Sequence, residues 1–242
     1  MSAKVNSTSR NEAISNIKDL TGSAMTVSQT SAQISFVAAV ASLVFLAALH
    51  VLSPEFDPSW RMVSEYALGN YGWVLSLMFI AWAVSSWALA FTIWSQARTR
   101  AGKIGLIFLI AAGVGEAMAS AFDINHPLHS VAAMIGILSL PIAAMLISIN
   151  LSRTEAWSPA RKALLWTANL TWVSVVLMAG TFILLIVTYT QAGGEMTSEV
   201  AALPPGVIAL VGWANRFLII AYCVWVMMVA RRAVTMPESR SS

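Results

Sequence analysis

The residues best suited to chemistry lie in a short polar break, residues 122–130, between two long apolar runs. The break contains Asp123, His126 and His129, and it holds two of the three histidines in the chain. An aspartate and two histidines can bind a divalent metal such as zinc, with a carboxylate such as Glu65 or Glu116 as a further ligand. The spacing matches no established metal-binding motif, and the alternative is that Asp123 only caps the next helix.

Ser64 and Glu65 suggest hydrolytic chemistry at the same membrane face. The candidate catalytic set is Ser64, Glu65, Asp123 and His129. In it, His126 and His129 with Asp123 bind a metal or act as a base, and Glu65 or Glu116 acts as a general acid or base. These residue kinds resemble those of alkaline-ceramidase-type membrane hydrolases, although no histidine lies beyond residue 129 to form their paired-histidine motif. The structural alternative is that Ser64 caps a helix that begins near Glu65.

Glu116 and Arg216 are the two charged side chains that fall well inside apolar runs. A charge in the hydrocarbon costs at least about 2.5–3.5 kcal/mol, so such a residue is normally paired or faces a polar cavity. Glu116 lies roughly 10 Å and Arg216 roughly 15 Å below the same membrane face, by the rise of 1.5 Å per helical residue. We therefore predict a buried Glu116–Arg216 ion pair with Asn215 as an extra partner, or alternatively an anion or proton site.

The elements that position these residues are apolar helices. Of the 242 residues, 58% are hydrophobic and 10% are charged, with a mean hydropathy of +0.73. Runs longer than roughly 18 apolar residues are typical of transmembrane helices. We therefore predict an all-α polytopic membrane protein, a bundle of six transmembrane helices. The membrane domain is predicted at 34–232, between polar tails at 1–33 and 233–242, with spans at about 34–52, 72–94, 104–121, 131–151, 163–189 and 206–230.

The distribution of positive charge predicts the orientation in the membrane. The amino-terminal tail, each of the loops 96–103 and 152–162, and the carboxy-terminal end all carry three Lys or Arg residues, whereas the opposite loops carry only Arg61. By the positive-inside rule, both termini are cytoplasmic. This predicts a multi-pass cell-membrane protein whose candidate site faces outward, with the amino-terminal tail largely disordered.

The order and spacing of several short motifs resemble the family of small membrane proteins known as domain of unknown function 998. The motifs are Ser64-Glu65 with Gly69 and Gly72, Gly102 after a basic loop, Phe122-Asp123 with His129, and Arg216 after Gly212. The resemblance covers about residues 35–232 and implies a bundle of about six spans. It implies no activity.

Three classes of function remain open at the level of sequence. The first is a membrane-embedded hydrolase, with metal assistance, that acts on a lipid-like substrate. The second is a structural or regulatory membrane subunit, and the third is a transporter of small solutes that uses Glu116 and Arg216. The expected partner is the lipid bilayer. A net charge of +3 gives no indication of a nucleic-acid partner, and the sequence does not reveal the oligomeric state or protein partners.

Overall fold

The computed structural model describes residues 28–194, 200 and 202–235. Within these residues the chain is helical and has no strand, and six helices are long and apolar enough to cross a membrane. The predicted all-α bundle of six transmembrane helices is thereby confirmed, and the chain is a multi-pass membrane protein. Most of the two predicted tails lies outside the described residues, but residues 28–33 belong to the first helix.

The long helices begin and end close to the predicted spans. The first helix, Ser28–Leu52, is followed by α2 (Gly72–Ile93), α3 (Arg100–Ala121), α4 (His129–Ser152), α5 (Arg161–Gln191) and α6 (Val211–Val234). Three short 3₁₀ helices join them: η1 (Val63–Leu68), η2 (Trp94–Gln96) and η3 (Glu155–Ala160). The sixth helix begins at Val211 instead of residue 206, and residues 206–210 are not helical.

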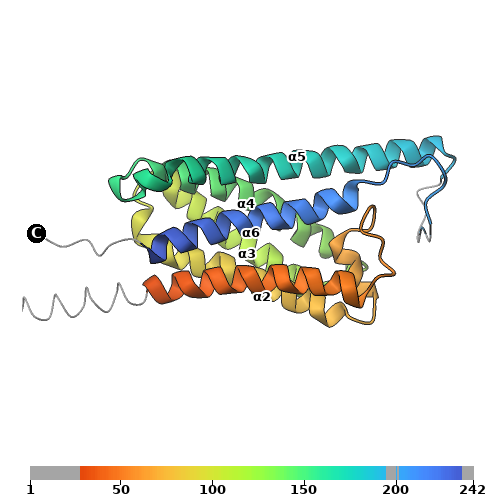
Figure 1. Cartoon of the computed structure of the whole chain (residues 1–242), viewed down its shortest axis with the longest axis horizontal. Helices are drawn as coiled ribbons and strands as arrows, with labels where there is room; N and C mark the ends of the chain where they lie inside the picture. Colours follow the sequence, from red (N-terminus) through yellow and green to blue (C-terminus); the bar gives the residue numbers. More distant parts are fainter. Residues whose placement is uncertain (1–27, 195–199, 201, 236–242) are drawn as a thin grey trace, which may run out of the picture.

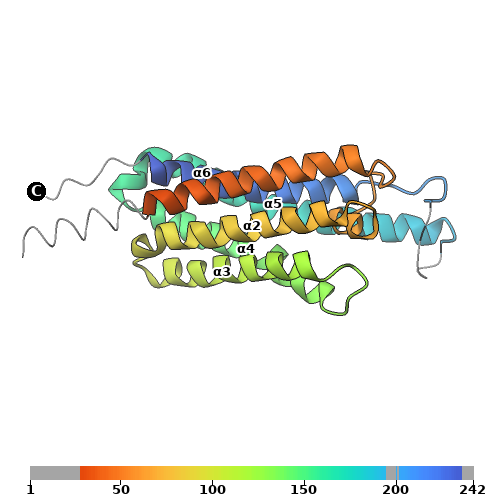
Figure 2. The same cartoon turned by 90° about the horizontal axis from the view of Figure 1, so that it is seen from below.

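All six helices run side by side along the long axis of the molecule (Figures 1 and 2). The first helix begins and α6 ends at the same end of the bundle, and we call this end the terminal end. The opposite end is formed by residues 53–71, 122–128 and 202–210, and we call it the site end. Chain neighbours therefore pack as antiparallel pairs, among which α3 and α4 share the most extensive contact.

The contact between α3 and α4 depends on glycine. A Cβ atom built on Gly115 would lie 2.5 Å from the backbone nitrogen of Gly136 and 2.8 Å from the carbonyl oxygen of Ala132. These distances leave no room for a methyl group, so the two backbones touch directly. Such close approach is how small residues stabilise helix pairs in membranes, where the hydrophobic effect does not drive helices together.

Helix α5 is longer and less covered than its neighbours. Its 31 residues correspond to about 46 Å, well beyond the roughly 30 Å hydrocarbon core of a bilayer. Its buried residues are Leu164, Ala168, Thr171 and Ser174, all toward the terminal end. Beyond Ser174 no residue of α5 is buried, and this half of the helix borders a cavity at the site end.

We expect Gly115→Ala to lower the free energy of unfolding by about 1–3 kcal/mol, because the added methyl group separates α3 from α4. The matched control is Gly180→Ala on α5, where a Cβ atom would meet nothing within 4 Å. Thermal unfolding of the purified protein in detergent measures both. Equal melting temperatures for the two variants would contradict the proposed packing.

Candidate functional site

Arg216 is the most fully hydrogen-bonded side chain at the site end. It is 3% exposed, and its Nε donates to Nε2 of His50 at 2.6 Å. Its Nη1 donates to the carbonyl oxygens of Arg61 and Gly212 at 2.8 and 3.0 Å, and its Nη2 donates to the hydroxyl of Tyr66 at 3.0 Å. Four acceptors, all uncharged, thus surround the guanidinium and connect α6 to the first helix and η1.

The predicted ion pair between Glu116 and Arg216 is wrong. Oε2 of Glu116 instead accepts a hydrogen bond from the Ser86 hydroxyl at 2.9 Å, and Oε1 has no partner among the described residues. The sequence gives the depth of each charge, but not the direction in which each helix turns it. Helices α3 and α6 are not close neighbours, since α3 packs against α2 and α4. Asn215 does not bridge the two charges either.

Glu65 has a structural role. Its Oε1 accepts from the backbone N–H of Met62, and its Oε2 pairs with Nη1 of Arg61, both at 2.7 Å. Arg61 also donates to the carbonyl of Val200. The Glu65 carboxylate therefore stabilises the start of η1 through both of its oxygen atoms. The expectation that Ser64 caps this helix is also wrong, because the residue before η1 is Met62.

Asp57, in the segment before η1, adds a negative charge at the site end. Its pKa lies below the ordinary value, first because the backbone N–H of Ser59 donates to the carboxylate at 2.9 Å, and next because of the Ser59 hydroxyl. The positive charge of Arg216 makes a smaller contribution in the same direction. The segment before η1 therefore carries a carboxylate that stays ionised at neutral pH.

The polar break does not assemble the predicted metal site. Asp123 accepts a hydrogen bond from the backbone N–H of Asn125, and Nδ1 of His126 accepts one from the N–H of Leu128. The ring of His129 bonds to the carbonyl oxygen of Phe122. Among the described residues, no group of three or more His, Cys, Asp or Glu side chains could hold a metal ion. The set Asp123, His126 and His129 therefore does not fit zinc. Each side chain satisfies the local backbone of a tight turn instead. Asp123 does not cap α4 either, because that helix follows Leu128 without a side-chain cap.

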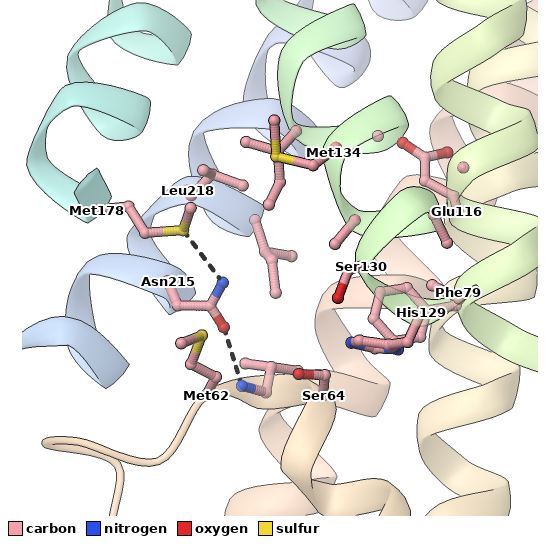
Figure 3. Close-up of a pocket in the computed structure, with 18 of the residues that line it drawn as sticks. Met62, Ser64, Phe79, Glu116, His129, Ser130, Met134, Met178, Asn215 and Leu218 are labelled. Atoms are coloured by element: carbon pink, nitrogen blue, oxygen red, sulfur yellow. Dashed lines mark hydrogen bonds between the residues drawn. The ribbon is translucent and has the colours of Figure 1, made fainter. Parts of the chain in front are cut away.

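A cavity of about 720 Å³ lies between η1 and helices α2 to α6 at the site end (Figure 3). Most of its lining is apolar, with α5 contributing Met178, Ala179 and Phe182. Near its base the hydroxyl of Tyr222 on α6 donates to the carbonyl of Ile137 on α4 at 2.6 Å. The polar side chains that line the cavity are Ser64, Glu65, Glu116, His129, Ser130, Asn215 and Tyr222, together with the indole of Trp82.

Ser64, His129 and Ser130 are brought together at the site end of this cavity. Figure 3 shows both hydroxyls and the edge of the His129 ring turned toward the same space. Nδ1 of His129 lies 3.0 Å from the carbonyl oxygen of Phe122. Because a carbonyl only accepts, Nδ1 carries the proton and Nε2 of the neutral ring is the basic nitrogen. Neither hydroxyl is hydrogen-bonded to another described residue. Of the candidate catalytic set, Ser64 and His129 thus share one space, whereas Asp123 lies outside it.

Asn215 is a site residue that the sequence suggests only as a partner for buried charge. Its Oδ1 accepts from the backbone N–H of Val63 at 2.9 Å, which directs its Nδ2 toward the cavity (Figure 3). There Nδ2 meets only the sulfur of Met178, at 3.5 Å, which is a weak acceptor. An amide donor that faces the same cavity as a serine and a histidine can stabilise negative charge on an oxygen atom of a ligand.

Comparison with known proteins gives a family and no activity. The model of the family described as "Protein of unknown function (DUF998)" matches residues 36–232. No curated protein and no solved structure matches the chain. The resemblance to alkaline-ceramidase-type hydrolases therefore rests on residue kinds alone.

We expect the effects of Arg216→Leu and Glu116→Leu on the free energy of unfolding to add within about 0.5 kcal/mol, because the two residues share no partner. Arg216→Leu combined with Tyr66→Phe should deviate from additivity by about 0.5–3 kcal/mol, since the two side chains are directly bonded. Double-mutant cycles in detergent measure both terms. A large coupling free energy between Arg216 and Glu116 would contradict the structure and support the ion pair that the sequence predicts.

Proposed function

The chain belongs to the DUF998 family, whose description assigns no activity, and from its own cavity we propose that it is a membrane-embedded hydrolase that cleaves the acyl ester of a lipid-like substrate. The observation that carries this proposal is the state of His129. Its Nδ1 is bonded to the Phe122 carbonyl, which leaves a basic Nε2 in a cavity that is lined by two unbonded serine hydroxyls. A base oriented by a hydrogen bond on its far nitrogen, next to a hydroxyl, is the arrangement that activates a serine nucleophile.

Ser64 is the proposed nucleophile. It approaches the cavity from η1, on an element separate from the helix that carries His129. Ser130 follows His129 directly on α4, and successive residues on a helix point about 100° apart. Although the Ser130 hydroxyl also faces the cavity, its position next to His129 on one helix makes it a less suitable proton donor to that ring than Ser64, which approaches from a separate element. Direct contact between Ser64 and His129 is expected to form when substrate is bound, as is common for catalytic hydrogen bonds.

The proposed reaction uses groups of this chain alone. Oγ of Ser64 bonds to the acyl carbon of the substrate while its proton passes to Nε2 of His129. Nδ2 of Asn215 donates to the oxygen that becomes negative. His129 then protonates the departing alcohol oxygen, and water attacks the acyl-serine to release the carboxylic acid and restore Ser64. The apolar lining accommodates the acyl chain of the lipid.

We propose that the site end faces the outside of the cell membrane, with both termini in the cytoplasm. The support is the charge distribution, because the two loops of the terminal end, the amino-terminal tail and the carboxy-terminal end of the chain together carry every Lys and Arg residue outside the predicted spans except Arg61. Substrate would then reach the cavity from the outer leaflet of the lipid bilayer that surrounds the bundle.

We expect Ser64→Ala and His129→Gln each to lower kcat for hydrolysis of a fluorogenic acyl ester in mixed micelles by about a thousandfold or more. Ser130→Ala is the matched control and should retain activity. The melting temperature of Ser64→Ala should stay near that of the native protein, because the lost hydroxyl holds no other residue. Full activity in Ser64→Ala would refute the assigned nucleophile. Absence of hydrolysis in the native protein would favour the structural or regulatory role.

The orientation can be tested with single cysteines on a Cys223→Ala background, since Cys223 is the one cysteine of the chain and is buried. Asn125→Cys at the site end should react with a membrane-impermeant maleimide on intact cells. Arg98→Cys at the terminal end should react only after the cells are opened. Both native residues are exposed, so accessibility differs only by side of the membrane. The reverse labelling pattern would invert the proposed topology.

A further inference from the structure

We propose that the cavity selects amphiphiles with a hydroxyl or amide group partway along the apolar chain, which binds Glu116 and Trp82. This inference deepens the proposed function and rests on it for the reactive end of the ligand. It concerns a second polar position in the same cavity, deeper than Ser64 and His129. Two buried polar atoms without partners support it.

The first of these atoms is Oε1 of Glu116. The side chain is 3% exposed and lines the cavity, and its other oxygen is held by the Ser86 hydroxyl at 2.9 Å. Oε1 has no hydrogen-bond partner among the described residues. Buried polar atoms are nearly always satisfied, because leaving one unpaired costs the full free energy of its lost hydration.

The second atom is Nε1 of Trp82, in a side chain that is 5% exposed and lines the same cavity. The indole is held between Phe79, stacked at 6.2 Å, and Tyr222, edge-on at 6.0 Å. It therefore cannot turn freely to find an acceptor in the protein. Trp82 lies one helical turn from Ser86 on α2, so its ring faces the same side as the hydroxyl that holds Glu116.

The chemistry of these two atoms selects the ligand group. An indole N–H only donates, so the ligand must supply an acceptor. The Glu116 carboxyl accepts a hydrogen bond when it is ionised and can donate one when it is protonated, so a ligand group that both donates and accepts satisfies it in either state. A hydroxyl or an amide provides both. A plain hydrocarbon chain provides neither, and an ammonium group would leave the N–H of Trp82 unpaired.

The depth of Glu116 gives the position of this group along the chain. A Cβ atom on Gly136 would lie 3.9 Å from the backbone nitrogen of Glu116, so Gly136 marks its level on α4. Gly136 follows His129 by seven residues in the sequence, which corresponds to about 10 Å along the helix. The selected amphiphile therefore carries its hydroxyl or amide about 10 Å from the group that meets His129.

The test compares methyl octadecanoate with methyl octadecanoates that carry a hydroxyl at successive chain positions. Dissociation constants are measured in detergent with purified full-length protein that carries Ser64→Ala, so that the esters are not cleaved, and the other variants are made on this background. We expect the Ser64→Ala protein to bind the best mid-chain hydroxy ester about tenfold more tightly than the plain ester. Glu116→Leu and Trp82→Phe should each lose most of this preference and still bind the plain ester. Trp87→Phe is the matched control and should keep the preference, because the Trp87 N–H donates to the Ile110 carbonyl outside the cavity.

Equal affinity of the Ser64→Ala protein for both esters, or a preference that survives in both further variants, would overturn the inference. If Glu116→Leu does not fold, Trp82→Phe decides the outcome. Hydrolysis of the plain ester by the native protein is measured in parallel, so that the two proposals can fail separately. Ser64-dependent hydrolysis without a hydroxyl preference refutes only this inference. A preference that depends on Glu116 and Trp82, without hydrolysis, supports the inference and refutes the proposed catalysis.

Discussion

The site end depends on how the buried guanidinium of Arg216 is satisfied. A charged side chain within an apolar bundle must find its acceptors inside the protein, since lipid offers none. Arg216 finds them in the first helix through His50, in η1 through Tyr66, and in the connecting backbone at Arg61. Displacing any one of these segments would leave a charged donor unpaired. The relative positions of α6, η1 and the first helix are therefore coupled, although they are far apart in the sequence.

The cavity is a result of that coupling. Arg216 and its neighbour Asn215 both bond to η1, the first through the hydroxyl of Tyr66 and the second through the backbone N–H of Val63. The segment before η1 lies so close to α6 that a Cβ atom at Gly212 would collide with the backbone of Pro58 and Arg61. Residues 58–65 are thus held across the site end, and Ser64 becomes part of the cavity wall. The loosely covered half of α5 closes the opposite side.

Hydropathy was sufficient to predict the six helices, because a membrane span is defined by length and apolarity, which are local properties. The residues that line the cavity were harder to predict. Ser64 and His129 were expected at the same membrane face because both flank spans there, and both line the cavity. Glu116 and Arg216 were wrongly paired, because hydropathy gives depth but not helix rotation. His126 and His129 suggested a metal site from the sequence. Their hydrogen bonds to nearby backbone depend on the conformation of the turn around Pro127, which the sequence alone does not give.

The four hydrogen-bond acceptors of Arg216 are all neutral, so no carboxylate is bonded to its positive charge, although that charge acts at a distance on Asp57. In surroundings of low dielectric constant, such a charge creates an electrostatic potential that water and salt screen only weakly. That potential extends into the adjoining part of the cavity, where Asn215 lies. It makes an oxygen atom there easier to charge negatively and opposes the entry of cationic head groups. For the reaction proposed above, the residue that holds the architecture together therefore also contributes a fixed positive potential.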